Sequence, residues 1–236
     1  MQRIYLKNTD LSQKYIIIKD KEIIHQLTKV LRVRWWEHIA LFNWEKAIDY
    51  IYEISEIWKK ELALEKKSQL NNDSEIDFEL SLFNGLPNKL EKIEYIIQKG
   101  TEIGFTQFIF FRTDRSQKLV ISDNKLIRLE KIIIEAAEQS GRAIIPQINI
   151  LDNFDINKLP DWKNIFFHTQ NENSSDLNNI SKQQWNKINL FVWPEWGWSN
   201  REVEILEHST SRIHLWNRIL RTETTGIVTG FYIIHS

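Results

Sequence analysis

The chain of 236 residues has no cysteine, which excludes disulfides, thiolate metal sites and a cysteine nucleophile. No apolar run approaches the roughly 20 residues that a membrane-spanning helix needs. The N-terminal residues MQRIYLKNTD lack the pattern of a signal peptide. A net charge of −1 gives no general sign of a nucleic-acid-binding protein. We therefore expect a soluble cytoplasmic protein with no membrane association.

Glycine is also scarce: there are 7, about half of the usual share of roughly 7%, whereas tryptophan occurs 10 times. The two anomalies meet in FVWPEWGWSN (191–200), where three tryptophans surround Pro194, Glu195 and Gly197 directly after an apolar run. A turn that follows such a strand is where α/β enzymes receive a cofactor. Glycine is the usual residue there because it adopts positive φ cheaply and lets a ligand touch the backbone.

The N-terminal part is rich in short β-forming runs: YIIIKD, HIALFNW, IDYIYEISEI and ELALEKK. These runs predict a small barrel or sandwich, with a helix in EIIHQLTKVLRVR, where apolar residues have helical spacing. The polar stretch KKSQLNNDSE (66–75) is interpreted as a linker. We therefore predict a domain over 1–70 and a second over 71–236. Residues 1–70 hold 13 Lys+Arg and 10 Asp+Glu, which weakly favours contact with an anion.

From residue 76 onward, strand and helix patterns alternate. The predicted strands are FELSLFNGL, FTQFIFFRT, IPQINIL, NIFFHT, INLFVW and RIHLW. The predicted helices are NKLEKIEYIIQKGTEIG, DNKLIRLEKIIIEAAEQSG, one that begins at the capping-box sequence SNRE, and TETTGIVTGFYIIHS. Since the strands are apolar on both faces, this alternation predicts a parallel sheet covered by helices.

Four polar stretches are candidates for contact with a nucleic acid. Arginine pairs with phosphate, and glutamine can recognise a base edge. Each stretch alone is explained as well or better by a solvated loop, helix end or barrel rim. The stretches are KVLRVR (29–34), RTDRSQK (112–118), EAAEQSGR (135–142) and RILRTET (218–224). Metal-binding spacings, a phosphate-binding Gly-x-x-x-x-Gly-Lys loop and a Gly-x-Ser-x-Gly elbow are absent from the sequence.

Taken in order, IIQKGTEIG, RTDRS, EAAEQSGR, the VxPExGWS turn and LxNRILRTET resemble the ribosomal RNA small subunit methyltransferase E family, and the resemblance covers essentially the whole chain. It implies an N-terminal PUA-like β-barrel and a C-terminal SPOUT methyltransferase domain with a trefoil knot, an exception to the rule that chains avoid threading. It also implies a homodimer that transfers the methyl group of S-adenosylmethionine to N3 of one uridine. That uridine would lie in 16S ribosomal RNA, either free or in the small ribosomal subunit.

The family has glycine at six positions where this chain has tryptophan: Trp36, Trp44, Trp58, Trp193, Trp196 and Trp216. We hypothesise that the source reads UGA as glycine and that the chain was translated with UGA as tryptophan. Glycine at these six positions would bring the chain to 13 glycines and 4 tryptophans. The alternative is a non-catalytic RNA-binding paralogue whose cofactor cleft is blocked by Trp193, Trp196 and Trp216.

The resemblance also implies where the cofactor lies, against the backbone of 192–197 and 215–221. The predicted cofactor-binding residues are Val192, Trp193, Pro194, Glu195, Trp196, Gly197, Leu215, Trp216, Ile219, Leu220 and Arg221. Because N3 of uridine must lose its proton before it attacks the methyl group, we predict Arg221 for charge stabilisation and Glu195 or Glu223 as base or orienting carboxylate. The predicted RNA-binding residues are Arg3, Arg32, Arg34, Arg115, Ser116, Gln139 and Arg142. No metal is expected.

Overall fold

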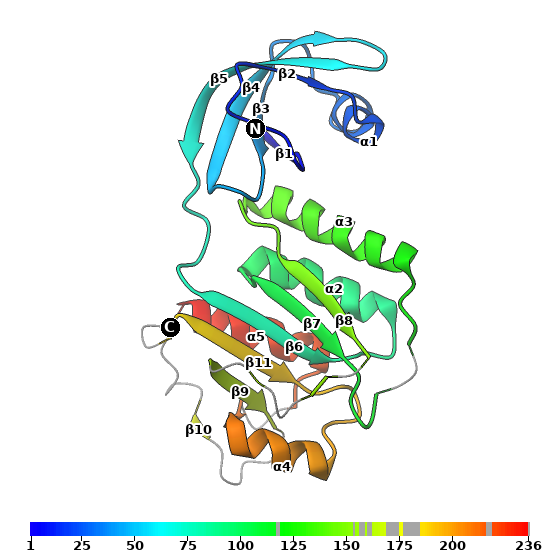
Figure 1. Cartoon of the computed structure of the whole chain (residues 1–236), viewed down its shortest axis with the longest axis vertical. Helices are drawn as coiled ribbons and strands as arrows, with labels where there is room; N and C mark the ends of the chain where they lie inside the picture. Colours follow the sequence, from blue (N-terminus) through cyan, green and yellow to red (C-terminus); the bar gives the residue numbers. More distant parts are fainter. Residues whose placement is uncertain are drawn as a thin grey trace. The chain divides into compact units, whose positions relative to one another are not determined.

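A computed structural model describes residues 1–116, 119–152, 154–155, 159, 162–168, 175–176, 185–215 and 219–235 (Figure 1). The chain divides into two compact units. The first unit comprises Met1–Glu75 and Ala137–Ile144, and the second comprises Ile76–Ala136 and Ile145–Ser236. Among the helices of the described ranges, none is both long enough and apolar enough to cross a membrane.

The first unit contains a five-stranded sheet of order β1-β3-β4-β5-β2. Its strands are β1 (Gln2–Tyr5), β2 (Tyr15–Ile18), β3 (His38–Phe42), β4 (Ile48–Ile57) and β5 (Leu62–Asn71). The linker predicted at 66–75 is wrong as far as Asn71, because β5 continues there as the partner of β4. This half of β5 is polar and mostly exposed, so its backbone pairing decides its conformation rather than its side chains. Strand β1 was not predicted, and a PUA-like barrel stays a prediction.

The helix expected between β2 and β3 is present over its first part. It comprises α1 (Lys21–His25) and a π-helical segment, η1 (Gln26–Val30). Asp20 caps its N-terminus by accepting hydrogen bonds from the backbone N–H groups of Glu22 and Ile23. The helical run stops before Arg32, whose φ is +54°, a left-handed conformation that does not continue a helix.

The second unit contains a seven-stranded sheet of order β10-β12-β9-β11-β6-β7-β8, and every strand pair in it is parallel. The strands are β6 (Glu79–Gly85), β7 (Gln107–Phe111), β8 (Gln147–Leu151), β9 (Lys163–Phe167), β10 (Ser175–Asp176), β11 (Lys187–Val192) and β12 (Ser211–His214). The predicted parallel sheet is therefore confirmed. The short strand β10 was not among the predicted strands.

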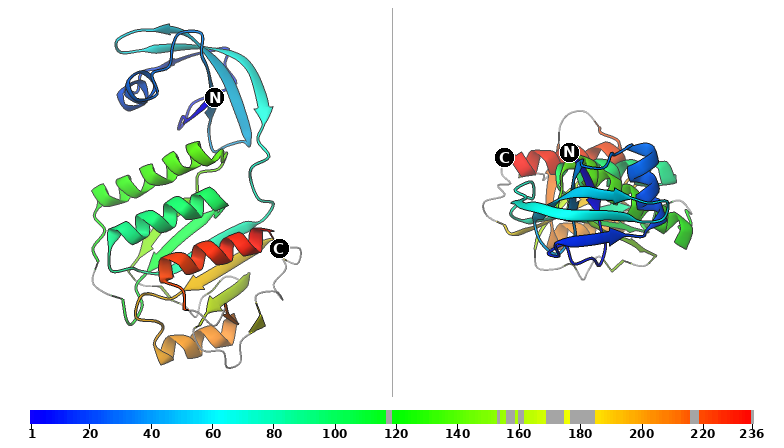
Figure 2. Two further views of the ribbon diagram at one scale, coloured as in Figure 1. Left: turned by 180° about the vertical axis from the view of Figure 1, so that it is seen from behind. Right: turned by 90° about the horizontal axis from the view of Figure 1, so that it is seen from above.

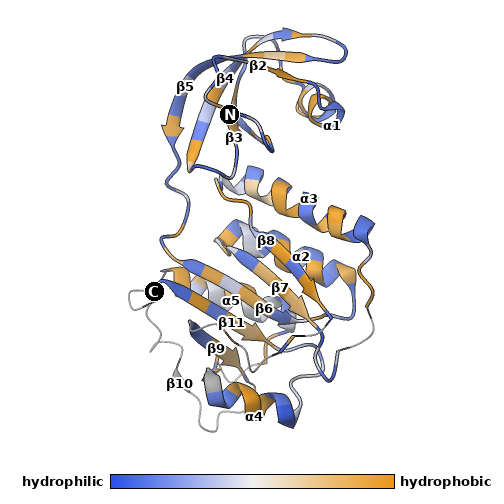
Figure 3. Ribbon diagram, viewed as in Figure 1, coloured by the Kyte–Doolittle hydropathy of each residue, from blue (hydrophilic) through white to orange (hydrophobic). Residues whose placement is uncertain are grey.

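Four helices accompany this sheet: α2 (Leu90–Ile103), α3 (Asp123–Ser140), α4 (Asn200–Ser209) and α5 (Thr222–His235). Polar and apolar residues alternate along α2, α3 and α4 (Figure 3), as expected for amphipathic helices. Helices α2 and α5 pack together on one face of the sheet (Figures 1 and 2). Helix α5 approaches β6 closely because Gly226 has no side chain: a Cβ there would lie 2.9 Å from Cδ1 of Leu82.

Strands β6 and β11 lie side by side in the middle of the sheet, and their apolar side chains form the centre of the core. The rings of Phe83 and Phe191 stack across the two strands with centroids 4.6 Å apart. Because the strands are parallel, the carboxyl ends of β6, β7, β9 and β11 meet at one edge. The loops that follow these strands are therefore brought together.

The tryptophan at position 36 has a backbone conformation that favours glycine. Trp36 has a φ of +74°, and its side chain is exposed, as is that of Trp35 beside it. The backbone N–H of Trp36 donates to the carbonyl of Ile54, 2.8 Å away, so the β4 strand fixes this conformation. A tryptophan held in the left-handed region is strained, which supports the hypothesis that glycine belongs here.

We predict that Trp36→Gly raises the free energy of unfolding by about 1 kcal/mol, because glycine adopts positive φ without a Cβ clash. Chemical denaturation followed by circular dichroism measures the change. Trp35→Gly is the matched control: it removes an adjacent exposed indole at ordinary φ and should lower or leave unchanged the unfolding free energy. Equal effects of the two substitutions would contradict the strain at Trp36.

Candidate functional site

The turn that follows β11 is held by the elements on both sides of it. The carbonyl of Trp193 accepts a hydrogen bond from the hydroxyl of Thr222, at the start of α5. Pro194 packs against Gly85, the last residue of β6, so closely that a Cβ at Gly85 would lie 2.7 Å from the proline Cδ. Gly197 has a φ of +72° and closes the turn by donating to the carbonyl of Pro194, 2.9 Å away. The backbone of 193–197 is thus fixed before any ligand arrives.

Glu195 ties the same turn to the start of α2. Its Oε1 accepts hydrogen bonds from the backbone N–H of Asn88 at 3.0 Å and from Nζ of Lys92 at 2.9 Å. Burial alone would raise the pKa of Glu195, but these two donors outweigh it and hold the pKa below its usual range. Glu195 is therefore an ionised anchor for the turn and a weak proton acceptor at neutral pH.

Glu223 lies in the first turn of α5, and its side chain is mostly buried. Its Oε2 lies 3.9 Å from Nζ of Lys92 and its Oε1 lies 3.9 Å from Nη1 of Arg221. Its Oε2 is buried and has no hydrogen-bond partner within the described part of the chain. The side chain of Arg221 is 85% exposed. The three predicted catalytic residues therefore form a chain of charges, with Lys92 between the two carboxylates.

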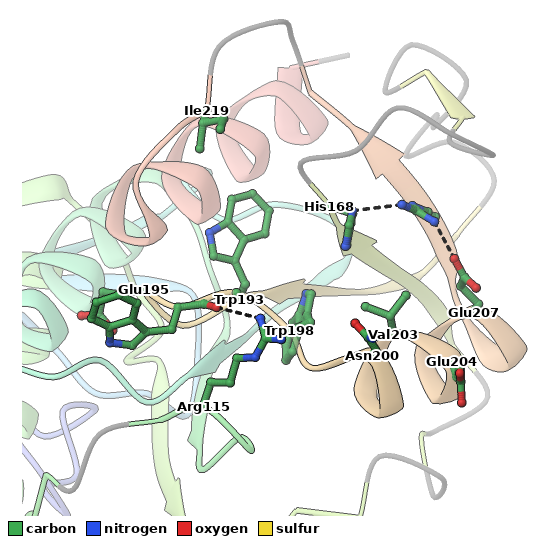
Figure 4. A pocket seen from close by; sticks show the side chains of 13 residues that line it. Arg115, His168, Trp193, Glu195, Trp198, Asn200, Val203, Glu204, Glu207 and Ile219 are labelled. Atoms are coloured by element: carbon green, nitrogen blue, oxygen red, sulfur yellow. Dashed lines mark hydrogen bonds and ion pairs between the residues drawn. The ribbon is translucent and has the colours of Figure 1, made fainter.

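An open cavity of ≈ 650 Å³ lies beside the turn (Figure 4). Trp193, Glu195, Trp196 and Gly197 line it from the turn. The other lining residues are Arg115, His168, Trp198, Asn200, Val203, Glu204, Glu207, Arg212 and Ile219. The volume is within the range of small-molecule sites, about 300 to 1,000 Å³. Both charges and aromatic rings face this cavity, as a ligand with polar and apolar parts requires.

The indoles of the turn differ in exposure. Trp193 is buried, with 8% of its surface accessible, although its side chain lines the cavity. Trp196 is 63% exposed. Trp198 donates from its indole Nε1 to the carbonyl of Phe167, 3.3 Å away. Trp193 and Trp196 have ordinary negative φ. The hypothesis that glycine belongs at these two positions therefore draws no support from φ and rests on the space that their indoles occupy in the cavity.

His168, Arg212 and Glu207 line the cavity as a linked group that sequence reasoning missed. Nη2 of Arg212 lies 3.0 Å from Nδ1 of His168, and Nη1 donates to Oε1 of Glu207 at 2.6 Å. Burial and the charge of Arg212 lower the pKa of His168, which keeps the imidazole neutral at pH 7. His168 directly follows β9, so the rule that ligands bind at the carboxyl ends of parallel strands was the signal that could have identified it.

The loop after β7 reaches the cavity and contains two predicted RNA-binding residues. Nη1 of Arg115 donates to the carbonyl of Trp196, 3.2 Å away. The hydroxyl of Ser116 accepts from the backbone N–H of Thr113 at 3.0 Å, which closes the loop. The structure thus brings Arg115 to the predicted cofactor turn (Figure 4).

The other predicted cofactor residues are arranged around this turn. Val192 is fully buried at the end of β11. Leu215 is partly buried against the core, Leu220 is partly buried, and Ile219 is 77% exposed. Trp216 lies outside the described residues. Of the residues after β12, only Ile219 lines the cavity in the part of the chain that the structure describes.

The remaining predicted RNA-binding residues lie in the first unit. Arg32 and Arg34 are exposed, and so is Gln139. Arg3, in contrast, forms a two-bond ion pair with Asp49 and donates to the carbonyl oxygens of Ala137 and Arg142. The side chain of Arg142 is 3% exposed and pairs with Glu75 at 2.7 Å. The structure therefore uses Arg3 and Arg142 to fix the segment 137–144 within this unit, a packing role that their charge did not reveal.

The comparisons with known proteins agree with this geometry. Residues 74–233 match the family of RNA methyltransferase domains. Ribosomal RNA small subunit methyltransferase E of Buchnera aphidicola is 32% identical over 234 residues, which cover 96% of this chain and 90% of that protein. The protein of the same name from Bacillus subtilis is 29% identical over 220 residues, or 87% of this chain and 84% of that protein.

Solved structures show the same relationship. The crystal structure of ribosomal RNA small subunit methyltransferase E from Neisseria gonorrhoeae, bound to S-adenosyl methionine, matches with a TM-score of 0.85 and 26% identity. The match covers 98% of this chain and 95% of that chain. The predicted α/β methyltransferase fold is confirmed, while the knot stays a prediction. Both the matched domain and the relatives that share nearly its whole length place this chain in the ribosomal RNA small subunit methyltransferase E family.

Proposed function

We propose that the chain transfers the methyl group of S-adenosylmethionine to N3 of a uridine in 16S ribosomal RNA. The fixed turn 193–197 beside an open cavity is the observation that carries this proposal. The solved relative from Neisseria gonorrhoeae is bound to S-adenosyl methionine and has the same fold over nearly the whole chain. The cavity supplies carboxylates for the positive charge of that cofactor and apolar surface for its adenine.

Residues of the turn would hold the cofactor through their backbone, and the cavity is large enough for it. The indoles of Trp193 and Trp196 would obstruct a ligand there, because both residues line the cavity beside that backbone. With glycine at these two positions, the backbone of the turn 193–197 would be accessible to the cofactor. The backbone of the turn therefore fits the cofactor, whereas the side chains of Trp193 and Trp196 do not.

When bound, S-adenosylmethionine supplies an electrophilic methyl group. The chain's own residues then have to deprotonate the uridine imide and stabilise the negative charge that spreads to its carbonyl oxygens. Glu223 has a buried oxygen without a hydrogen-bond partner in the described residues, so it is the better base. Arg221, exposed beside it, would stabilise the imide anion. Glu195 would act as an orienting carboxylate because its charge is already used by Lys92 and Asn88.

The remaining parts of the proposal concern assembly. We infer a homodimer in the cytoplasm and a first unit that acts as a PUA-like RNA-binding domain. Its exposed Arg32, Arg34 and Gln139 would contact RNA. In the second unit, Arg115 and Ser116 would do so. Within the described ranges, the structure has no group of three metal-ligating side chains.

The second candidate function is a non-catalytic RNA-binding protein. The observation that favours it is the indole of Trp193, which is buried although it lines the cavity. This candidate shares the RNA contacts with the enzyme but not the cofactor.

We predict that the variant with glycine at positions 36, 44, 58, 193, 196 and 216 binds S-adenosylmethionine at least about tenfold more tightly than the chain as written, because removing the indoles opens the turn. Calorimetric titration of the cofactor into both proteins measures this. The glycine variant should also convert uridine to N3-methyluridine in transcribed 16S ribosomal RNA, detected by nucleoside mass spectrometry. If both proteins are folded and neither binds the cofactor, the RNA-binding candidate replaces the enzyme.

For catalysis, we predict that Glu223→Gln in the glycine variant lowers kcat by about 10²- to 10⁴-fold, the usual contribution of a general base. The affinity for S-adenosylmethionine should change little, because the amide keeps the shape of the side chain. Glu91→Gln, an exposed carboxylate on α2, is the matched control and should leave kcat unchanged. A loss of cofactor affinity equal to the loss of kcat would contradict the role of Glu223 as base.

For stability, we predict that Glu195→Gln lowers the free energy of unfolding by about 1 to 2 kcal/mol at pH 7, through the loss of charge-assisted hydrogen bonds. The pKa of Glu195 is depressed in the folded chain, so its contribution is present above the unfolded pKa and is lost as pH falls through the folded value. The difference between parent and variant should therefore shrink below about pH 4. Urea denaturation across this pH range tests it, and a difference independent of pH would refute the ionised anchor.

A further inference from the structure

The loop after β7 is tied to the start of α4 by a group of hydrogen bonds around Asp114. The carboxylate of Asp114 accepts from Nη2 of Arg201 at 2.6 Å and from its Nε at 3.2 Å. It also accepts from the hydroxyl of Ser199 at 2.6 Å. Arg201 and Ser199 together lower the pKa of Asp114, so the carboxylate is ionised at neutral pH.

A buried carboxylate, that of Glu202, also connects the loop after β7 to the start of α4. Glu202 is 5% exposed, and its Oε2 accepts from the backbone N–H of Ser199 at 2.8 Å, which completes the capping box of α4. Its Oε1 accepts from the backbone N–H of Asp114 at 2.9 Å. One glutamate therefore caps the helix and fixes the loop.

These hydrogen bonds around Asp114 restrict the position of Arg115, the next residue in the loop. Because both the backbone and the side chain of Asp114 are held, Arg115 leaves the loop in a set direction and reaches the carbonyl of Trp196 at 3.2 Å. Arg115 is itself exposed. Arg115 lines the cavity, whereas Asp114 does not, so Asp114 can position its neighbour without contacting a ligand there.

We propose that Asp114 is a positioning residue for RNA recognition, which holds Arg115 at the edge of the cavity where the phosphate backbone of the target RNA passes. The inference rests on the proposed function, since it assumes that ribosomal RNA is the substrate. Asp114 has a negative charge, and a negative charge beside a phosphate backbone weakens binding through simple electrostatics. The two effects therefore predict opposite changes in RNA affinity when this charge is removed. Loss of positioning should weaken binding, whereas loss of electrostatic repulsion should strengthen it.

The test measures the affinity of the full chain for transcribed 16S ribosomal RNA by filter binding at fixed salt. Asp114→Asn should weaken binding about three- to tenfold, although it removes a negative charge and releases Arg201. Asp152→Asn is the matched control: it breaks the ion pair of Asp152 with Arg112, 2.7 Å apart, at the end of the neighbouring strand β8. That variant should bind as tightly as the parent or more tightly.

A second comparison shows whether Asp114 acts through Arg115. In an Arg115→Gln background, Asp114→Asn should no longer weaken binding. The inference is overturned if Asp114→Asn behaves like Asp152→Asn, or if it weakens binding by the same factor with and without Arg115. If Asp114→Asn does not fold, as judged by circular dichroism, Arg201→Gln replaces it, and its loss of affinity must then disappear in the Arg115→Gln background. If the parent does not bind the transcript at all, the proposed substrate fails and this inference fails with it.

Discussion

The close contact between the end of β6 and the turn after β11 is the constraint on which the site depends. Gly85 leaves room for the ring of Pro194, and the hydroxyl of Thr222 holds the carbonyl just before that proline. Because β6 and β11 are adjacent in the middle of a parallel sheet, the two loops cannot move apart without disrupting the core. A turn fixed in this way presents its backbone to a ligand with little further loss of conformational freedom.

Carboxylates near the N-termini of three helices also hold the loops of the second unit in place. Three carboxylates of the second unit each hold a backbone N–H or a cation: Glu195 at the start of α2, Glu202 at the start of α4 and Glu223 at the start of α5. Each lies near a helix N-terminus, where the unpaired N–H groups favour negative charge. Of the three, Glu223 retains a buried oxygen with no hydrogen-bond partner among the described residues, and this difference separates a candidate base from two structural anchors.

The excess of tryptophan has two physical consequences in the structure. At Trp36 the backbone is in a region that suits glycine. At Trp193 and Trp196 the backbone is ordinary, and the side chains instead occupy space in the cavity. Both consequences agree with glycine as the functional residue. At Trp36 the reason is the backbone conformation, and at Trp193 and Trp196 it is the volume of the side chain. The affected positions are far apart in the sequence. This is expected if every one of them is a UGA codon that was translated as tryptophan instead of glycine.

The sequence by itself determined the alternation of strands and helices in the second unit, the capping box at Ser199 and the family, because these depend on local periodicity and on ordered motifs. It did not determine the extent of β5, since the polar residues 66–71 form a strand only through pairing with β4. Nor did it separate Arg115 from Arg3: both are arginines in promising segments, yet one lies exposed at the cavity and the other is held by Asp49 and two carbonyl groups. Only the tertiary structure decides this, because the role of a charged side chain depends on partners that are distant in sequence.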